Sequence, residues 1–260
     1  MKTRKRSHGH VAKKSWLIAL ILMAAISAIV LFQLTLFKEH KPKAAIVDSL
    51  YLLIPNEEFL SQAEQILREA GFEVEKFIGE NVTVDLFKQL ISMDLDLIIF
   101  RVHSAYVCFT EEGEALISVY FFSGEEYNES MYLEEQLLDE VVVGRVKIDG
   151  EEKSFFAITP RLILNSDGKL NDAIIIVDSC YGLNNTYMAK AFIKKGAKAY
   201  IAWDREVDAL YADNATLTLL RFLYINEFSV EDAVSATLTE CGKDPFYKSL
   251  LTYYLKNETS

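Results

Sequence analysis

The chain has 260 residues, of which 51% are hydrophobic and 25% charged, and this balance is typical of a globular protein rather than a disordered, collagen-like or disulfide-dense chain. Six of its 27 Lys and Arg residues, but none of its 38 Asp and Glu residues, lie in residues 1–37, so the rest of the chain is strongly acidic. Such a body repels phosphate backbones, which argues against nucleic acid as a partner.

The first predicted element is a transmembrane helix. No charged residue occurs from Trp16 to Phe37, and a helix of these 22 residues is long enough for the ~30 Å hydrocarbon core of a bilayer. A buried core helix is the alternative interpretation. We therefore expect a basic tail over 1–14, a transmembrane helix over 15–37, a linker over 38–43 and one α/β domain over 44–260.

The distribution of cations predicts the orientation in the membrane. The cations before the hydrophobic stretch outnumber those just after it, so the N-terminus is expected in the cytoplasm. The lipid bilayer is then a partner, and the C-terminal domain of this single-pass cell-membrane protein lies outside. Five sequons agree with an outside location and are candidate glycosylation sites: Asn81, Asn128, Asn184, Asn214 and Asn257.

The three cysteines are an odd number, so one thiol has no partner within the chain. Because an outside location permits disulfides, we expect Cys108 and Cys241 to pair and Cys180 to stay free.

After Pro42, short apolar runs alternate with amphipathic stretches, which predicts a parallel sheet flanked by helices. Asn56 and Thr83 are expected to cap the first two helices. The strands expected in this first part are 43–47, 72–77 and 97–100.

Two hairpins are predicted to interrupt this alternation as insertions. Segments 106–110 and 115–121 flank a turn containing Gly113, and segments 141–148 and 154–158 flank Asp149-Gly150.

The alternation then resumes to the C-terminus. We expect strands over 173–177 and 199–203, and helices over 187–195, 207–224, 230–240 and 245–255.

Two reactive side chains follow strands that are expected to be central. His103 comes after the apolar strand that ends near Val102, and Cys180 follows the strand over 173–177. Because the carboxyl ends of parallel strands meet at one edge of a sheet, the imidazole and the thiol should emerge together. A histidine next to a cysteine can take the thiol proton and return it to a leaving amine.

The segments LIIFRVHS, AIIIVDSCYG and GAKAYIAW resemble the caspase-like (clan CD) cysteine peptidases, which include caspases, metacaspases, gingipains and legumains. The resemblance covers residues 44 to about 225. It implies a caspase-like α/β fold in which Cys180 is the nucleophile and His103 the general base. The backbone N–H groups of Cys180 and Ser104 would form the oxyanion hole. Ser104 stands where this family commonly has glycine.

The resemblance to metacaspases also implies a substrate preference. There, an acidic residue two positions before the nucleophile lines the pocket for the residue preceding the cut bond, and Asp178 has that position here. Asp204 could reach the same pocket, so we expect cleavage of a peptide or protein substrate after Arg or Lys. The alternative for Asp178 is a hydrogen bond to loop amides.

Three classes of function stay open at this point. The first is a cysteine endopeptidase, the second an inactive caspase-like domain that binds peptides or proteins, and the third a small-ligand receptor domain of the doubly wound type. The sequence has no glycine-rich phosphate-binding motif, no Cys-x-x-Cys and no His-Glu-x-x-His, so we expect no cofactor and no metal.

Overall fold

The structure is a computed structural model that describes residues 41–111, 114–148 and 150–256, together with Met23, Ala25 and Ser27. Within these ranges, the side chains of residues 107–117 and of Ile148 are not described. The chain divides into two units, Met1–Lys41 and Pro42–Ser260. The second unit contains all the elements discussed below.

The predicted transmembrane helix is not supported. Among the residues described, no helix is both long and apolar enough to cross a membrane. Most of segment 15–37 lies outside the described residues, as does the basic tail before it. The expected fold class is corrected accordingly: the described residues form an α/β domain, and none of their helices is a transmembrane helix.

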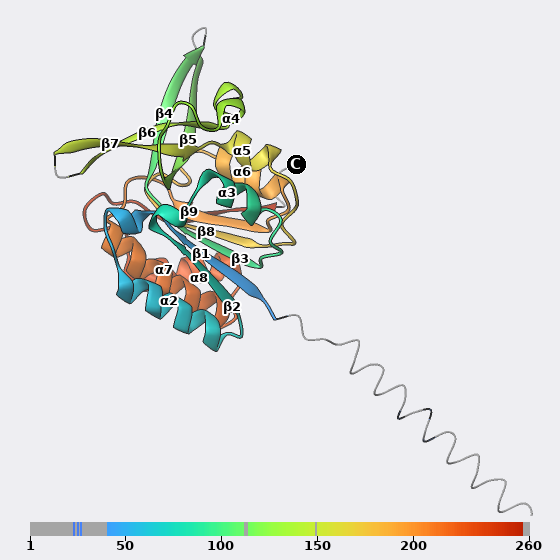
Figure 1. Cartoon of the computed structure of the whole chain (residues 1–260). Helices are drawn as coiled ribbons and strands as arrows, with labels where there is room; N and C mark the ends of the chain where they lie inside the picture. Colours follow the sequence, from blue (N-terminus) through green and yellow to red (C-terminus); the bar gives the residue numbers. More distant parts are fainter. Residues whose placement is uncertain are drawn as a thin grey trace, which may run out of the picture. The chain divides into compact units, whose positions relative to one another are not determined.

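The centre of the second unit is a six-stranded sheet (Figure 1). Its strand order is β10-β9-β8-β3-β1-β2, and only β10 runs antiparallel to its neighbour. The strands are β1 (Lys43–Asp48), β2 (Glu73–Ile78), β3 (Leu97–Arg101), β8 (Ile174–Asp178), β9 (Ala199–Trp203) and β10 (Leu251–Leu255). Every residue of β3, β8 and β9 is buried, which explains why β9 is an apolar run and why β3 and β8 are apolar up to their last residue.

Helices cover both faces of this sheet because alternate side chains of each strand point to opposite sides. Ala44 and Ile46 of β1 face a core built with α2 (Glu57–Glu69), α7 (Ala209–Tyr224) and α8 (Val230–Cys241). Ala45 and Val47 face the other core, with helices α3 (Val84–Leu90), α5 (Pro160–Asn165) and α6 (Tyr187–Lys194).

The two predicted helix caps are confirmed. The Asn56 side chain accepts a hydrogen bond from the N–H of Phe59, and the Thr83 hydroxyl accepts one from the N–H of Leu86. Each satisfies a donor that the first turn of a helix leaves without an intrahelical partner. Short 3-10 helices η1 (Leu50–Leu52) and η2 (Gly79–Asn81) follow β1 and β2.

Both predicted hairpins form, and together they make a second sheet with the order β4-β5-β7-β6. Its strands are β4 (Ser104–Glu111), β5 (Glu114–Glu126), β6 (Val141–Ile148) and β7 (Glu151–Ile158), with the short helix α4 (Leu133–Leu137) between the hairpins. Phe121 and Phe156 of this sheet are buried in the same core as α3, α5 and α6. The two inserted hairpins therefore pack together as one layer of the domain.

The predicted helix over 245–255 is wrong. The Asp244 carboxylate accepts hydrogen bonds from the N–H groups of Phe246 and Tyr247, which folds this segment into a turn. Lys248 then has a positive φ of 60°, and the chain continues as β10 along β9. Thr252, Tyr253 and Tyr254 are residue types that favour a strand.

Candidate functional site

The strands that precede His103 and Cys180 are hydrogen-bonded neighbours. β3 and β8 pair in parallel, with Arg101 opposite Asp178. His103 and Cys180 each lie two residues beyond these paired positions. The main chain therefore brings the two residues to one edge of the sheet, as expected from the sequence.

Two serines link the loops that follow these strands. The Ser104 hydroxyl donates a hydrogen bond to the carbonyl oxygen of Cys180 and accepts one of 2.5 Å from the Ser179 hydroxyl. Both serines are buried. This link holds the main chain after His103 against the main chain at Cys180.

The Cys180 side chain faces the segment between β9 and α7. Its sulfur lies 3.5 Å from both the backbone nitrogen and the carbonyl oxygen of Val207. Burial raises the pKa of the Cys180 thiol, and the nearby carboxylates of Glu206, Asp178 and Asp244 add to this shift. The resting thiol is therefore protonated at neutral pH.

The His103 ring packs on the second sheet. It makes an edge-on contact with Phe122, with the ring centroids 4.9 Å apart. Burial lowers the pKa of His103, so the imidazole is neutral at neutral pH and able to accept a proton. Among the described residues, no hydrogen bond joins this ring to the sulfur of Cys180.

The backbone N–H of Ser104 points away from β5. The N–H of Phe122 donates a 2.8 Å hydrogen bond to the carbonyl of His103, which makes these two residues a hydrogen-bonded pair of the antiparallel ladder. Such pairs alternate with pairs whose backbone groups point outward. Ser104, paired with Phe121, has an outward position, so its N–H takes no part in the β4–β5 pairing, and its role as an oxyanion donor stays a prediction.

Tyr181 follows the candidate nucleophile in a strained conformation, with a φ of 56°. Its ring contacts that of Tyr106 at a centroid distance of 4.8 Å. Burial and a hydrogen bond to Glu206 raise the pKa of the Tyr181 hydroxyl to about 12. Strained residues in turns cluster at functional sites, so Tyr181 adds a second unusual feature beside Cys180.

A buried cluster of charged residues lies at the carboxyl ends of the same strands, on the face that packs against α7. Arg101 donates to Asp48 at 3.0 and 3.1 Å, to Asp213 at 2.6 and 3.0 Å, and to the carbonyl of Ile54 at 2.9 Å. Arg101 and Asp48 are 0% exposed, and Asp213 is 2% exposed. The cluster thereby attaches β1 and β3 to α7.

This cluster was not predicted, although the sequence contains a pattern that indicates it. The apolar strands β1, β3 and β8 each end in a charged residue, namely Asp48, Arg101 and Asp178, and these three are side by side in the strand register. An ionised residue at the end of a buried strand needs a partner, and three in register indicate one shared cluster.

Asp178 belongs to the interior of the protein. It is 2% exposed, and its Oδ2 has no hydrogen-bond partner. Burial, together with the charge of Asp213, raises the pKa of Asp178 well above its usual range, because burial disfavours the charged form of the carboxyl. Burial also raises the pKa of Asp48, to about 6, despite the attraction of Arg101.

The prediction that Asp178 and Asp204 line one pocket for a basic side chain stays a prediction, and the two carboxylates have different neighbours. Arg101 already occupies the space between Asp48 and Asp213, next to Asp178. The Asp204 carboxylate instead accepts a 2.7 Å hydrogen bond from the N–H of Leu250, which attaches β9 to the segment before β10. The two carboxylates have separate structural environments.

The predicted Cys108–Cys241 disulfide stays a prediction. Cys241 is a free, half-buried cysteine in the structure, as is Cys180. The side chain of Cys108 lies outside the described residues.

Four of the five predicted glycosylation asparagines are exposed, namely Asn81, Asn128, Asn184 and Asn214. Asn257 lies outside the described residues. Exposure is compatible with modification, and occupancy at every site stays a prediction.

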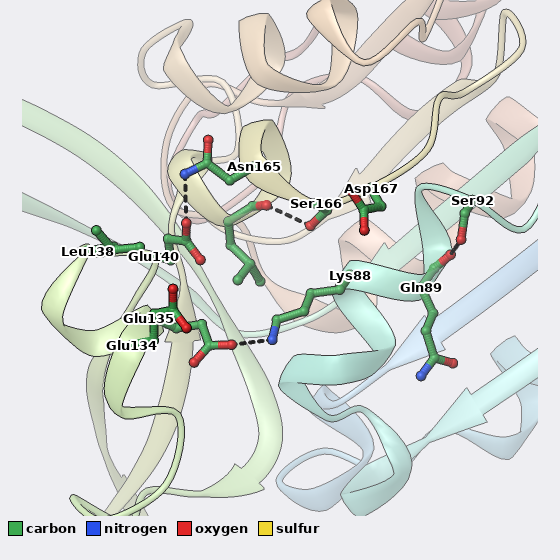
Figure 2. Close-up of a pocket in the computed structure, with 11 residues that line it drawn as sticks. Lys88, Gln89, Ser92, Glu134, Glu135, Leu138, Glu140, Asn165, Ser166 and Asp167 are labelled. Carbon is green, nitrogen blue, oxygen red and sulfur yellow. Dashed lines mark hydrogen bonds and ion pairs between the residues drawn. The ribbon is translucent and has the colours of Figure 1, made fainter.

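A cavity of about 440 Å³ lies apart from these residues, between α3, α4 and α5 (Figure 2). Lys88 pairs with Glu135 there, and Asn165 donates a 2.6 Å hydrogen bond to Glu140. Neither His103 nor Cys180 lines it. Within the described part of the chain, no group of three or more His, Cys, Asp or Glu side chains is arranged to hold a metal ion.

Comparison with known proteins adds no assignment: no protein-family model matches the chain, and no curated protein matches it.

Proposed function

We propose that the domain is a cysteine peptidase in which His103 acts as the base for Cys180. The observation that carries this proposal is the register of β3 and β8, which brings the two residues to neighbouring strand ends. The link from Ser104 to the carbonyl of Cys180 supports it further, since it fixes the spacing of the two loops. A reactive pair needs such fixed geometry.

The chemistry follows from the protonation states of the two side chains. The neutral His103 ring takes the proton from the Cys180 thiol, and the thiolate sulfur forms a bond to the carbonyl carbon of a peptide. The carbon–nitrogen bond then breaks, and the imidazolium gives its proton to the leaving amine. Water, deprotonated by the same ring, hydrolyses the resulting thioester and restores the thiol.

The negative charge on the substrate oxygen needs hydrogen-bond donors. The N–H of Ser104 has the outward orientation derived above, and the N–H of Cys180 is next to the attacking sulfur. Backbone donors of this kind stabilise a tetrahedral intermediate by about 3–4 kcal/mol each. Attack also requires the Cys180 side chain to rotate away from Val207 toward His103.

A second candidate is an inactive domain that binds peptides or proteins. The raised pKa of Cys180 and its contacts with Val207 favour this alternative, since catalytic thiols more often have a lowered pKa.

Peptide turnover separates the two candidates. The full chain is incubated with a fluorogenic peptide library, alongside Cys180→Ala, His103→Ala and the control Cys241→Ala, whose thiol is also half-buried. The proposal requires cleavage that both dyad variants abolish and the control retains. Cleavage by no form, with peptide binding retained in Cys180→Ala, identifies the binding domain instead.

A further inference from the structure

The cavity between α3, α4 and α5 has an excess of negative charge. Its volume of about 440 Å³ lies in the range of small-molecule binding sites. Among the residues that line it, one is a cation, Lys88, and four are carboxylates: Glu134, Glu135, Glu140 and Asp167.

Lys88 does not neutralise this excess, because its charge is already paired. The ammonium group forms an ion pair with Glu135 and lies 3.3 Å from the carboxylate of Asp85 (Figure 2). It also lies 5.5 Å from the ring centroid of Tyr132, which adds a cation–π contact. The other three carboxylates of the cavity form no ion pair within the described part of the chain.

Glu140 is the carboxylate with the most unusual environment. It is 8% exposed, and its Oε1 accepts a 2.6 Å hydrogen bond from the side-chain amide of Asn165. Among the described residues, its Oε2 has no hydrogen-bond partner. A carboxylate buried beside a neutral amide has lost much of its hydration without gaining a counter-charge. The cavity therefore contains a buried negative charge that a bound cation would stabilise.

The position of this charge is fixed by the main chain. The N–H of Glu140 donates a 2.8 Å hydrogen bond to the carbonyl of Glu135 at the end of α4. The carbonyl of Glu140 accepts a 3.0 Å hydrogen bond from the N–H of Thr159, which caps α5. A ligand that binds here meets a carboxylate that is already in place.

The lining of the cavity favours an organic cation over a metal ion. The described carboxylates are not grouped to hold a metal, whereas the apolar side chains of Leu138 and Leu162 also line the cavity. Ammonium groups donate hydrogen bonds to carboxylates, and an aliphatic chain between them can contact the two leucines.

We propose that this cavity binds a linear aliphatic polyamine, with one ammonium group at Glu140 and another at Glu134 or Asp167. Several ammonium groups match several unpaired carboxylates, which a monoamine cannot do. Neither His103 nor Cys180 lines the cavity, so the proposal does not depend on the proposed peptidase activity.

Titration calorimetry of the full chain with spermidine tests the proposal. The buffer contains about 150 mM salt, which screens attraction to the acidic surface in general. Glu140→Gln removes the charge and keeps an oxygen that can accept from Asn165, and the control Glu231→Gln removes one exposed charge on α8. We expect Glu140→Gln to raise the Kd by at least about tenfold and the control to leave it unchanged.

A second pair of variants guards against misfolding of Glu140→Gln, which circular dichroism detects. Glu134→Gln/Asp167→Asn changes two exposed residues of the cavity, and the control Glu69→Gln/Glu231→Gln has the same net charge with the cavity intact. We expect the first variant to bind spermidine at least about threefold more weakly than its control.

Three outcomes overturn the proposal. The first is that the unmodified chain binds no spermidine. The second is that each cavity variant binds spermidine as tightly as its control, which assigns the binding to the acidic surface as a whole. The third is that n-butylamine, with a single ammonium group, binds as tightly as spermidine.

Discussion

Replacing Arg101 by methionine tests the buried charged cluster. Methionine has a similar length and retains the packing over the Phe59 ring, which lies 5.6 Å from the guanidinium carbon. It removes the donors to Asp48, Asp213 and the carbonyl of Ile54, and leaves two buried carboxylates without their cation. Removing one partner of a buried ion pair costs about 3–5 kcal/mol of the free energy of unfolding.

The sign of the pH dependence follows from the carboxylates. Burial already raises the pKa of Asp48 to about 6, and loss of Arg101 raises it further. A carboxyl whose folded-state pKa exceeds its unfolded value stabilises the fold below the unfolded pKa, and this contribution is lost as the pH rises through the folded pKa. The cost of Arg101→Met is therefore larger at pH 7 than at pH 5.

Urea unfolding followed by circular dichroism measures this cost. The matched control is Arg68→Met, because Arg68 pairs with Glu64 on the surface and its side chain is 60% exposed. A surface pair of this kind contributes at most about 0.5 kcal/mol. If Arg101→Met costs no more than the control, or costs more at pH 5 than at pH 7, the account of the cluster is wrong.

Three further predictions concern the surroundings of Cys180. Asp178→Asn should cost several times less free energy of unfolding at pH 7 than Asp213→Asn in the same urea assay. Burial raises the pKa of Asp178 well above its usual range and so disfavours its charge, whereas the Asp213 carboxylate accepts hydrogen bonds from Arg101 that Asp213→Asn weakens. Glu206→Gln should accelerate alkylation of Cys180 by iodoacetamide at pH 7, because the Glu206 charge raises the pKa of the thiol. The control is Glu231→Gln, at an exposed position on α8, and an alkylation rate of Glu206→Gln no higher than that of the control contradicts the prediction. Gly182→Ala should lower the free energy of unfolding by about 1–3 kcal/mol, because the new Cβ would lie 2.7 Å from the Cβ of Ala202. An unchanged urea midpoint would contradict this prediction and show that the turn after Cys180 accommodates the extra methyl group.

The central strands could be predicted because local sequence determines them. β3, β8 and β9 are short, fully buried apolar runs, and Asn56 and Thr83 mark helix starts through contacts within three residues. The same local rules failed at 245–255, where pairing with β9 decides between helix and strand. Tertiary pairing commonly overrides weak local preference.

The site was predictable only as far as the strand order determines it. Placing His103 and Cys180 at one edge needed no more than the assumption that their strands are neighbours. The direction of the Cys180 side chain depends on Val207, and the environment of Asp178 depends on Arg101 and α7. Arg101 and Asp213 are 112 positions apart, and no spacing rule connects residues at that separation.

Covalent labelling with a peptidyl acyloxymethyl ketone tests the proposed dyad most directly. The full chain, His103→Ala and Cys241→Ala are each treated with the reagent at pH 7, and the modified residue is located by peptide mass spectrometry. The account predicts a single modification on Cys180 that depends on His103 and is unchanged in Cys241→Ala. Labelling of Cys180 at the same rate in His103→Ala, or equal labelling of all three cysteines, would contradict it.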